Sequence, residues 1–403
     1  MRMMKIMKVF FEKIVVLYRK ILNKYFHFIF RFPNKDIIFE DLVKYHKKAE
    51  KEIVFVFPFP SCPWGYMFQR PQQLAKTLAS KGYLVIYCVD TSFPYKPDFF
   101  VRGLMELAPN LLLFNDGQNG EALKKFDQKA RLVIWQYWPH QYNFIKRLEF
   151  EKLIYDCIDD LTTFNQYDDI NKNFEDSLEK ADLVLVTADN IAKEISKYRN
   201  DYLMAPNAVK YDDFSIINHF ALSYDSNIPD NNLESDSIII GYYGAIADWV
   251  NLDLIEYCAK ERPRWKFVLI GQQYPNLSLP QKPNILYYNR QPYEKLPYYL
   301  SKFDVAILPF KINDITMNTS PVKIFEYMAG GKPVVSTRLP EVEKYDPILI
   351  ADSNEEFLMK LEEAYSLKND ETYISSLKQV AFENTWEIRV ESVLNKLHER
   401  GVI

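Results

Sequence analysis

The stretch Asn318-Thr-Ser-Pro-Val-Lys-Ile-Phe-Glu-Tyr-Met-Ala-Gly-Gly-Lys-Pro-Val-Val-Ser-Thr337 decides the fold of the C-terminal half of the chain. Ser320 has the chemistry of a helix N-cap, and Pro321 suits the first helical position, where a missing N–H loses no partner. The apolar run 303–310 comes just before this stretch and predicts a buried strand. The sequence therefore predicts a strand, a polar loop and a short capped helix in succession.

The end of this helix is marked as clearly as its start. Gly330 and Gly331 suit a left-handed helix end, and Pro333 prevents the helix from continuing. Val334 and Val335 then begin another strand. A strand, helix and strand in this order are typical of a parallel α/β sheet.

The start of the predicted helix has the chemistry of an anion site. A helix N-terminus collects free N–H groups and about half a positive charge. Asn318, Thr319 and Ser320 are small enough to let an anion approach, while Lys323 and Glu326 lie three residues apart on one helix face. These residues could hold a ligand that carries both a phosphate, bound at the cationic helix start, and a diol, bound by the carboxylate. The alternative is a Lys323–Glu326 surface pair worth about a few tenths of a kcal/mol.

The segment 320–335 resembles the nucleotide-sugar-binding segment of GT-B glycosyltransferases of the family-4 type, in the form found in the bacterial cell-surface polysaccharide (teichuronic-acid-like) subgroup. The resemblance implies that Glu326 holds the ribose hydroxyls and that Ser320 and Lys323 lie at the diphosphate. It also places Asn318 and Thr319 in the donor site. The family usually has a glutamate eight residues before the ribose ligand, and here that position is Asn318.

Composition limits the function classes. The 403 residues suffice for two domains, and 48% are hydrophobic. Residues 1–35 carry a net charge of +8, so the remainder carries −12, which argues against nucleic-acid binding. No cofactor or metal is expected: the cysteines show no metal-ligand spacing, and no Gly-x-Gly-x-x-Gly follows the first strand to support a dinucleotide site. We expect the four cysteines to be buried, reduced thiols in a cytoplasmic protein. They are Cys62, Cys88, Cys157 and Cys258.

The N-terminal run 1–32 is apolar but interrupted by charge throughout. It is too often charged for a membrane span, and no cleavage site of a signal peptide follows it. On a helical wheel its basic residues share one side and its apolar residues the other. This pattern is typical of a helix that lies in the surface of an anionic membrane, here the inner face of the cell membrane. The alternative is a helix packed on the protein itself or on a partner.

An α/β pattern follows this run. The apolar strand 53–57, the helix 68–79 and the strand 83–89 predict a doubly wound sheet with ligands at the carboxyl ends of its strands. Trp64, Gly65 and Arg70 resemble the acceptor-side loop of the same transferase subgroup. In that interpretation Arg70 meets a phosphate of the acceptor or donor. The alternative is a helix-start arginine paired with a local acid.

Two strand ends supply candidate catalytic residues. His140 follows the strand 132–135, and three carboxylates, Asp156, Asp159 and Asp160, follow the strand 153–155. Like charges this close raise at least one pKa, which is one route to a proton acceptor near neutral pH. A metal site or an exposed acidic turn are the alternatives. Because the segment also resembles the corresponding transferase loop, His140, Asp159 and Asp160 are the catalytic candidates.

In the C-terminal half the strand 238–244 runs into a glycine turn at Gly244, which leaves room for a phosphate or sugar. The basic residue that the family usually carries after this turn is missing, which shifts the diphosphate contact to Lys323 and Arg70. Arg290 lies where the family forms its base pocket. In the first half, Ala208 replaces the family's usual glycine, so positive φ is not required there.

The sequence thus predicts a GT-B fold, in which two doubly wound, Rossmann-like domains face each other across a cleft. The resemblance implies a metal-independent, retaining transfer of sugar from a nucleoside diphosphate to a glycan or lipid-linked acceptor. A nucleotide-sugar epimerase and an inactive scaffold subunit are the alternatives. The expected parts are a membrane-associating helix (1–35), an acceptor-binding domain (52–214), a donor-binding domain (237–375) that follows the polar linker 215–236, and a returning C-terminal helix (376–403).

Overall fold

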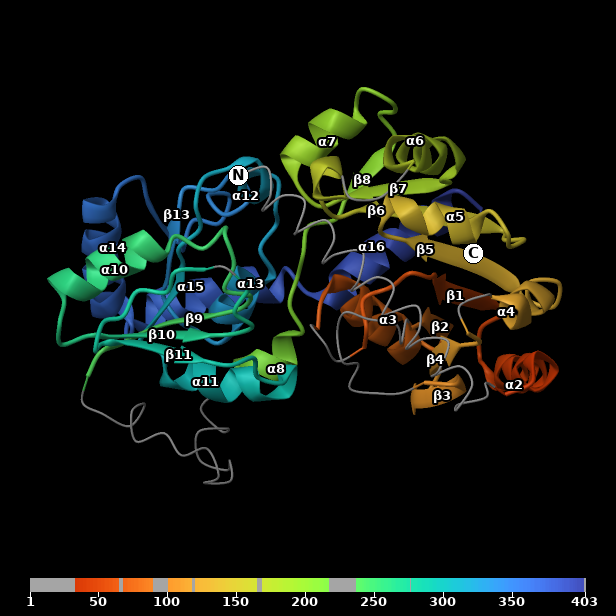
Figure 1. The fold of residues 1–403 in the computed structure, drawn as a ribbon, viewed down its shortest axis with the longest axis horizontal. Coiled ribbons are helices and arrows are strands. Elements are labelled where there is room, and N and C mark those ends of the chain that lie inside the picture. The colour runs from red at the N-terminus through yellow and green to blue at the C-terminus, as the bar shows by residue number, and fades with distance from the viewer. Residues whose placement is uncertain are drawn as a thin grey trace, which may run out of the picture. The chain divides into compact units, whose positions relative to one another are not determined.

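The computed structural model describes residues 33–64, 68–89, 101–117, 120–164, 169–216, 237–275 and 277–401 (Figure 1). The expected membrane-associating helix lies almost wholly outside these ranges, as do Gly65 and most of the predicted linker. The described residues form two compact units. The first contains the described residues up to 64 together with the described parts of 78–134 and 143–151, and the second contains 68–77, 135–142 and the described residues from 152 on.

The first unit is built on a mostly parallel sheet with the strand order β3-β4-β2-β1-β5. Only the edge pair β3–β4 is antiparallel. Every residue of β1, β2 and β4 is buried, because these continuous apolar runs are covered on both faces. The strands are β1 (Ile53–Phe57), β2 (Leu84–Cys88), β3 (Gly103–Ala108), β4 (Leu111–Asn115) and β5 (Arg131–Gln136). The helices are α2 (Lys35–Lys48) and α4 (Glu121–Phe126); α3 (Arg70–Ser80) and α5 (Tyr142–Ile145) have residues in both units.

The second unit begins with three parallel strands, β6 (Lys152–Cys157), β7 (Leu183–Val186) and β8 (Tyr202–Met204). Short helical turns follow the strand ends and carry several of the candidate residues. These turns and helices are η1 (Pro139–Gln141), η2 (Leu161–Phe164), α6 (Ile170–Lys180), α7 (Asp189–Ile195) and α8 (Tyr211–Ser215).

A six-stranded parallel sheet with the order β11-β10-β9-β12-β13-β14 forms the rest of this unit. Its strands are β9 (Ile239–Tyr243), β10 (Lys266–Ile270), β11 (Ile285–Tyr288), β12 (Val305–Leu308), β13 (Val334–Thr337) and β14 (Leu349–Ala351). The helices and turns with them are α10 (Leu252–Glu261), η3 (Tyr293–Lys295), α11 (Leu296–Lys302), α12 (Asp314–Met317), α13 (Val322–Ala329), α14 (Asn354–Leu367), α15 (Glu371–Phe382) and α16 (Trp386–Glu399). In Figure 1 these elements are drawn from green to blue.

The predicted helix is present as α13, but its start differs from the prediction. Pro321 is the N-cap and the helix begins at Val322, so the assignment of Ser320 as N-cap is wrong. The hydroxyl of Ser320 instead accepts a hydrogen bond from another loop, as described below. At the other end Gly331 is left-handed with φ 65°, as predicted, whereas Gly330 is right-handed with φ −73°.

Two smaller expectations can be compared with the structure. Cys88, Cys157 and Cys258 are buried as predicted, whereas Cys62 is half-buried. Ala208 does not have positive φ, in agreement with the absence of glycine there. Among the described residues no helix combines the length and apolar composition needed to span a membrane.

Candidate active site

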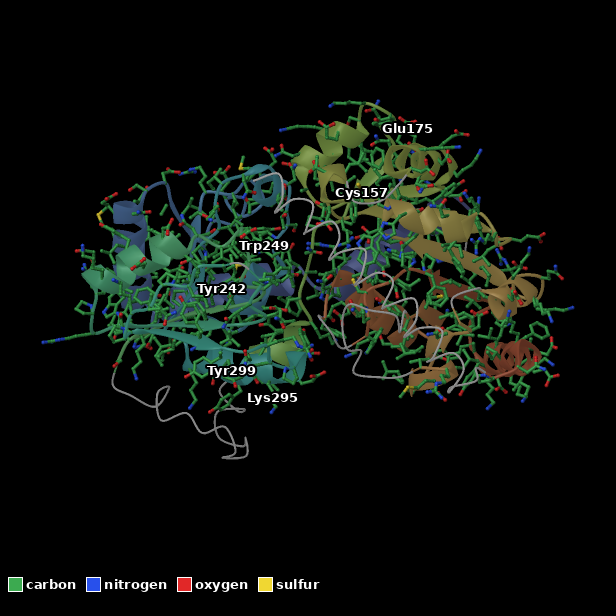
Figure 2. All side chains as sticks on the ribbon, viewed as in Figure 1. Cys157, Glu175, Tyr242, Trp249, Lys295 and Tyr299 are labelled. Atoms are coloured by element: carbon green, nitrogen blue, oxygen red, sulfur yellow. The ribbon has the colours of Figure 1, made fainter. Side chains whose placement is uncertain are left out.

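Gly244 and Lys323, two predicted donor-binding residues, lie against each other. Gly244 follows β9 with φ 146°, and its N–H donates to the carbonyl of Ile270 at 2.8 Å. A Cβ at residue 244 would lie 2.9 Å from Nζ of Lys323, so a larger residue would displace the ammonium. Figure 2 labels Tyr242 just before this turn, and its hydroxyl donates to the carbonyl of Ala245 at 2.9 Å. The turn after β9 and the first turn of α13 therefore form one cationic surface.

Glu326 lies one turn further along α13 and is only 5% exposed. Burial raises the pKa of its carboxyl to about 7, while the charge of Lys323 and the neighbouring Tyr243 act in the opposite direction. Burial also lowers the pKa of Lys323, and Glu326 opposes that shift. The two charged groups thus stabilise each other's charged form electrostatically, while burial opposes the charge of each.

The segment before α13 is held by hydrogen bonds to two loops that come earlier in the chain. Nδ2 of Asn318 donates to Oδ2 of Asp160 at 3.0 Å. The backbone N–H of Asn207 donates to Oγ of Ser320 at 3.1 Å, and Nδ2 of Asn207 donates to the carbonyl of Ser320 at 2.6 Å. The hydroxyl of Thr319 donates to the carbonyl of Ile315 at 2.7 Å. The predicted donor residues 318 to 320 are thereby fixed from two loops.

The three carboxylates after β6 separate into different environments. Asp156 is fully buried, whereas Asp159 and Asp160 are half-buried. The pKa of Asp159 is raised to about 6, first by burial and then by Asp160 and Asp156. Oδ1 of Asp160 accepts from the backbone and hydroxyl of Thr162 at 2.9 and 2.6 Å, so both of its oxygens are engaged. Among the described residues no group of three or more His, Cys, Asp or Glu side chains is arranged to hold a metal.

His140 lies in η1 and is 8% exposed. Its ring stacks on Trp138 with centroids 5.3 Å apart, and Phe164, at the end of η2, lies 6.0 Å from it. Burial lowers the pKa of His140 to about 4, so the imidazole is neutral at physiological pH. Phe164 ends the turn that begins just after Asp160, which places His140 near the acidic loop.

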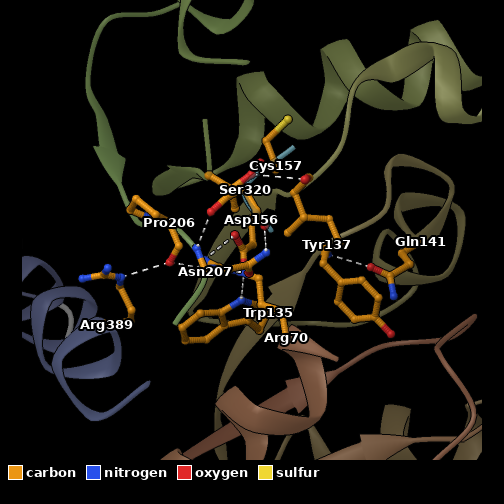
Figure 3. Close-up of polar contacts among 12 residues, drawn as sticks. Arg70, Trp135, Tyr137, Gln141, Asp156, Cys157, Pro206, Asn207, Ser320 and Arg389 are labelled. Atoms are coloured by element: carbon orange, nitrogen blue, oxygen red, sulfur yellow. Dashed lines mark hydrogen bonds and ion pairs between the residues drawn. The ribbon is translucent and has the colours of Figure 1, made fainter. Parts of the chain in front are cut away.

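Arg70 lies at the start of α3 and is 4% exposed (Figure 3). Nε and Nη2 donate to the two carboxylate oxygens of Asp156 at 2.8 and 3.0 Å. Nη1 donates to the carbonyl of Pro206 at 3.2 Å and to Oδ1 of Asn207 at 3.4 Å. The acid that pairs with Arg70 is 86 residues away in the sequence, not local. That Arg70 binds an acceptor or a phosphate stays a prediction.

The remaining candidates lie elsewhere. Trp64 is buried in the first unit, with its ring edge-on to Tyr87 at 5.0 Å. Arg290 lies on the surface just after β11. Gly65 lies outside the described residues.

Several residues of this region were not among the candidates. Tyr243 ends β9, and burial raises its pKa, as does the charge of Glu326. Tyr293 packs its ring on Phe68 at 4.9 Å, and burial, Glu326 and Asp213 raise its pKa. The sequence contains no local signal for these contacts, because a tyrosine at a strand end is equally typical of a core. Asn207, the partner of Ser320, was not predicted either, because the two residues are 113 positions apart in the sequence.

Known proteins can now be compared with this geometry. Residues 238–366 match the family described as glycosyl transferases group 1. Bacillus subtilis (strain 168) TuaH, which is assigned as a teichuronic acid biosynthesis glycosyltransferase, is 24% identical over 375 residues, or 86% of this chain and 89% of TuaH. A sucrose-phosphate synthase from Thermosynechococcus elongatus superposes with a TM-score of 0.61 at 14% identity, over 87% of this chain and 99% of its own. Anabaena HepE, solved with UDP and glucose, superposes with a TM-score of 0.55 at 13% identity, over 86% of this chain and 99% of the HepE chain.

The two parallel α/β sheets and the glycosyl transferases group 1 domain define a GT-B glycosyltransferase, and the predicted fold class is confirmed. The chain is an enzyme of this class, similar to the surface-polysaccharide subgroup represented by TuaH. These relatives favour neither the epimerase nor the inactive scaffold.

The contact between Asn318 and Asp160 can be tested by reversing its electrostatics. The substitution Asn318→Asp places a second carboxylate against Asp160 and removes a charge-assisted hydrogen bond, which should lower the free energy of unfolding by about 2 kcal/mol at pH 7.5. Repulsion raises the pKa of one carboxyl in the folded state, so the deficit relative to wild type should shrink as the pH falls to 5. Urea unfolding at the two pH values measures both effects.

Asn318→Ala is the matched control, because it removes the hydrogen bond without adding charge. Its deficit should be smaller than that of Asn318→Asp at pH 7.5 and the same at both pH values. An Asn318→Asp variant as stable as wild type at pH 7.5 would show that the Asp160 contact is not formed in solution.

Proposed function

We propose that the protein transfers a sugar from a nucleoside-diphosphate donor to a hydroxyl group of a glycan or lipid-linked glycan during synthesis of a bacterial surface polysaccharide. The observation that carries this proposal is the gathering of Gly244, Lys323 and Glu326 at the first turns of α13, inside the glycosyl transferases group 1 domain. The polysaccharide follows the assignment of TuaH, and the donor class follows the UDP bound to HepE. In this proposal residues 237–375 bind the donor and residues 52–214 the acceptor.

The donor would be held by three kinds of contact. The first N–H groups of α13 have no intrahelical acceptor, and Lys323 adds a full positive charge beside the glycine turn. Both favour a diphosphate at the start of the helix. The carboxylate of Glu326, one turn deeper, would accept hydrogen bonds from the two ribose hydroxyls.

The reaction breaks the bond between the sugar's anomeric carbon and the diphosphate oxygen, and forms a bond from that carbon to the acceptor oxygen. Negative charge develops on the leaving diphosphate, where Lys323 and the helix amides stabilise it. We propose that this charge is neutralised without a bound metal and that the anomeric configuration is retained, as the resemblance implies. The acceptor proton would pass to Asp159, whose pKa of about 6 suits a general base better than the lowered pKa of His140. Both oxygens of Asp160 are already engaged in hydrogen bonds.

Transfer itself can be measured with radiolabelled nucleotide sugars. Purified protein incubated with UDP-glucose or GDP-mannose and a lipid-linked glycan should move label into the lipid fraction only when both donor and glycan are present. EDTA should leave the rate unchanged, and the product anomer determined by NMR should match that of the donor. The control is Glu326→Ala, which should lose transfer because the donor no longer binds.

The alternatives give different outcomes in the same experiment. Conversion of the donor to an isomer without glycan would show an epimerase. Binding without any turnover across the donor panel, together with function of the Glu326→Ala variant in vivo, would show a scaffold. An EDTA-sensitive rate would overturn only the metal-independent part of the proposal.

Donor affinity should depend on pH through Glu326. Because the pKa of its carboxyl is raised to about 7, the ribose-binding carboxylate is mostly charged at pH 8 and mostly protonated at pH 6. If only the carboxylate accepts the two hydroxyls, the apparent Kd for UDP should rise about tenfold from pH 8 to pH 6, in proportion to the loss of the competent form. Calorimetric titration with UDP at these pH values measures the change.

The phosphates of UDP also titrate, and the substitution Glu326→Gln separates the two contributions. This variant should bind UDP more weakly at pH 8 and should retain only the pH dependence of UDP itself. Equal pH dependence in the variant and the wild type would exclude Glu326 as the ribose ligand.

We also propose that residues 1–32 bind the anionic inner face of the membrane, where a lipid-linked acceptor would be found. A basic residue near an anionic surface contributes about 1 kcal/mol, so replacing Lys13, Lys20 and Lys24 by Gln should lower partitioning roughly a hundredfold. Flotation with vesicles containing phosphatidylglycerol, compared with pure phosphatidylcholine, measures the loss.

The control replaces three lysines that are exposed on the first unit, Lys47, Lys48 and Lys129, by Gln. This variant has the same net charge and should float like wild type. Equal flotation of both variants would show that the N-terminal run packs on the protein or on a partner.

A further inference from the structure

A buried cluster links the start of α3 to the start of α13. Arg70 forms two nearly parallel hydrogen bonds to Asp156, and the two side chains are 4% and 0% exposed (Figure 3). Asp156 also accepts from Nε1 of Trp135 at 3.0 Å. Every acceptor oxygen of this carboxylate is therefore satisfied, and its position is fixed by two partners.

The remaining donor of Arg70 is directed at the loop that precedes α8. Nη1 contacts the carbonyl of Pro206 and Oδ1 of Asn207. This contact orients the amide of Asn207, because an oxygen that faces Arg70 turns Nδ2 the other way. That Nδ2 group donates to the carbonyl of Ser320 at 2.6 Å.

Asn207 holds Ser320 at two points. Its backbone N–H donates to Oγ of Ser320, and its side chain donates to the carbonyl of the same residue. Oγ then has its own proton left to donate. Two bonds to a single residue fix both the position and the rotation of the peptide that leads into Pro321 and α13.

A buried ion pair is a poor source of stability, since desolvation of the two charges offsets most of their attraction. A specific geometric role explains the pair better, and only Arg makes the fork-shaped contact to a carboxylate and a third contact beside it. Arg70 is not placed to contact a ligand directly, because its guanidinium faces Asp156, Pro206 and Asn207.

We propose that Arg70, which is held in place by Asp156, is a positioning residue for the donor and acts through Asn207 to fix Ser320 and the first turn of α13. This inference rests on the proposed function, because it assigns a role in nucleotide-sugar binding to residues outside the glycosyl transferases group 1 domain. It replaces a direct contact of Arg70 with phosphate by an indirect one.

The test compares binding and stability in single and double variants. Asn207→Ala removes the side-chain bond to Ser320 and should raise the Kd for UDP and the KM for the donor about tenfold, with the acceptor KM unchanged. Arg70→Lys keeps the charge but loses the paired hydrogen bonds to Asp156, and should raise the same Kd and KM by a similar factor. The double variant should bind no more weakly than Asn207→Ala alone, because both changes break one chain of contacts.

Trp135→Phe is the matched structural control. It removes a hydrogen bond to Asp156 but leaves the contacts from Arg70 to Asn207 and Ser320. It should therefore lower the midpoint of thermal unfolding without changing the Kd for UDP. Parallel losses of UDP affinity and stability in Trp135→Phe would show that the cluster is merely structural.

Two outcomes separate this inference from the proposed function. If Glu326→Gln weakens UDP binding but Asn207→Ala and Arg70→Lys do not, the positioning role is wrong and the donor site stands. If Glu326→Gln leaves UDP binding unchanged, the proposed donor site itself is wrong. If Arg70→Lys changes only the acceptor KM, Arg70 contacts the acceptor directly and the positioning role is wrong. If Arg70→Lys does not fold, the result for Asn207→Ala decides the test.

Discussion

The close approach of Lys323 to the backbone of Gly244 is the constraint on which the site depends. A side chain at residue 244 would overlap the end of the Lys323 side chain, and the residue would have to adopt φ 146°, so both the turn and the position of Lys323 favour glycine there. The same packing leaves Lys323 half-buried one turn before the buried Glu326, and burial lowers the pKa of the ammonium and raises that of the carboxyl. An anion at the start of α13 would favour the charged ammonium and reverse one of these shifts. In the proposed donor site, diphosphate binding and protonation of this pair would therefore be coupled.

The sequence was sufficient for the elements that are determined locally. The strands β1, β2 and β9 lie within one residue of their predicted ends, because continuous apolar runs bounded by turn residues leave little choice. The helix α13 was predicted from its proline and glycine signals. The first residue of α13 was not predicted correctly, because the hydroxyl of Ser320 is bonded to Asn207, 113 residues away. No local sequence pattern indicates such a distant partner.

The acidic loop shows why residues close in sequence need not form one site. Asp156, Asp159 and Asp160 were considered together because they fall within five residues. Strand β6 extends to Cys157, however, so Asp156 lies inside the strand and is buried against Arg70, whereas the other two follow the strand end. Repulsion among the three contributes less to the raised pKa of Asp159 than burial does. Asp156 differs from Asp159 and Asp160 because it pairs with Arg70 of α3, a contact that the sequence could not show.

The same cluster also bears on the basic residue that is missing after the Gly244 turn. Arg389 donates to the carbonyl of Pro206 at 3.0 Å, the same carbonyl that Arg70 contacts. No carboxylate of the described residues forms an ion pair with Arg389, so the positive charges of Arg70 and Arg389 outnumber the one carboxylate, Asp156, that pairs with Arg70. This excess positive charge lies beside Asn207, which is bonded directly to Ser320. Because a buried charge is weakly screened, it favours an anion at the start of α13 without touching it. If α13 binds a diphosphate as proposed, charge from Arg70 and Arg389 would take over part of the role of the basic residue that is missing after the Gly244 turn.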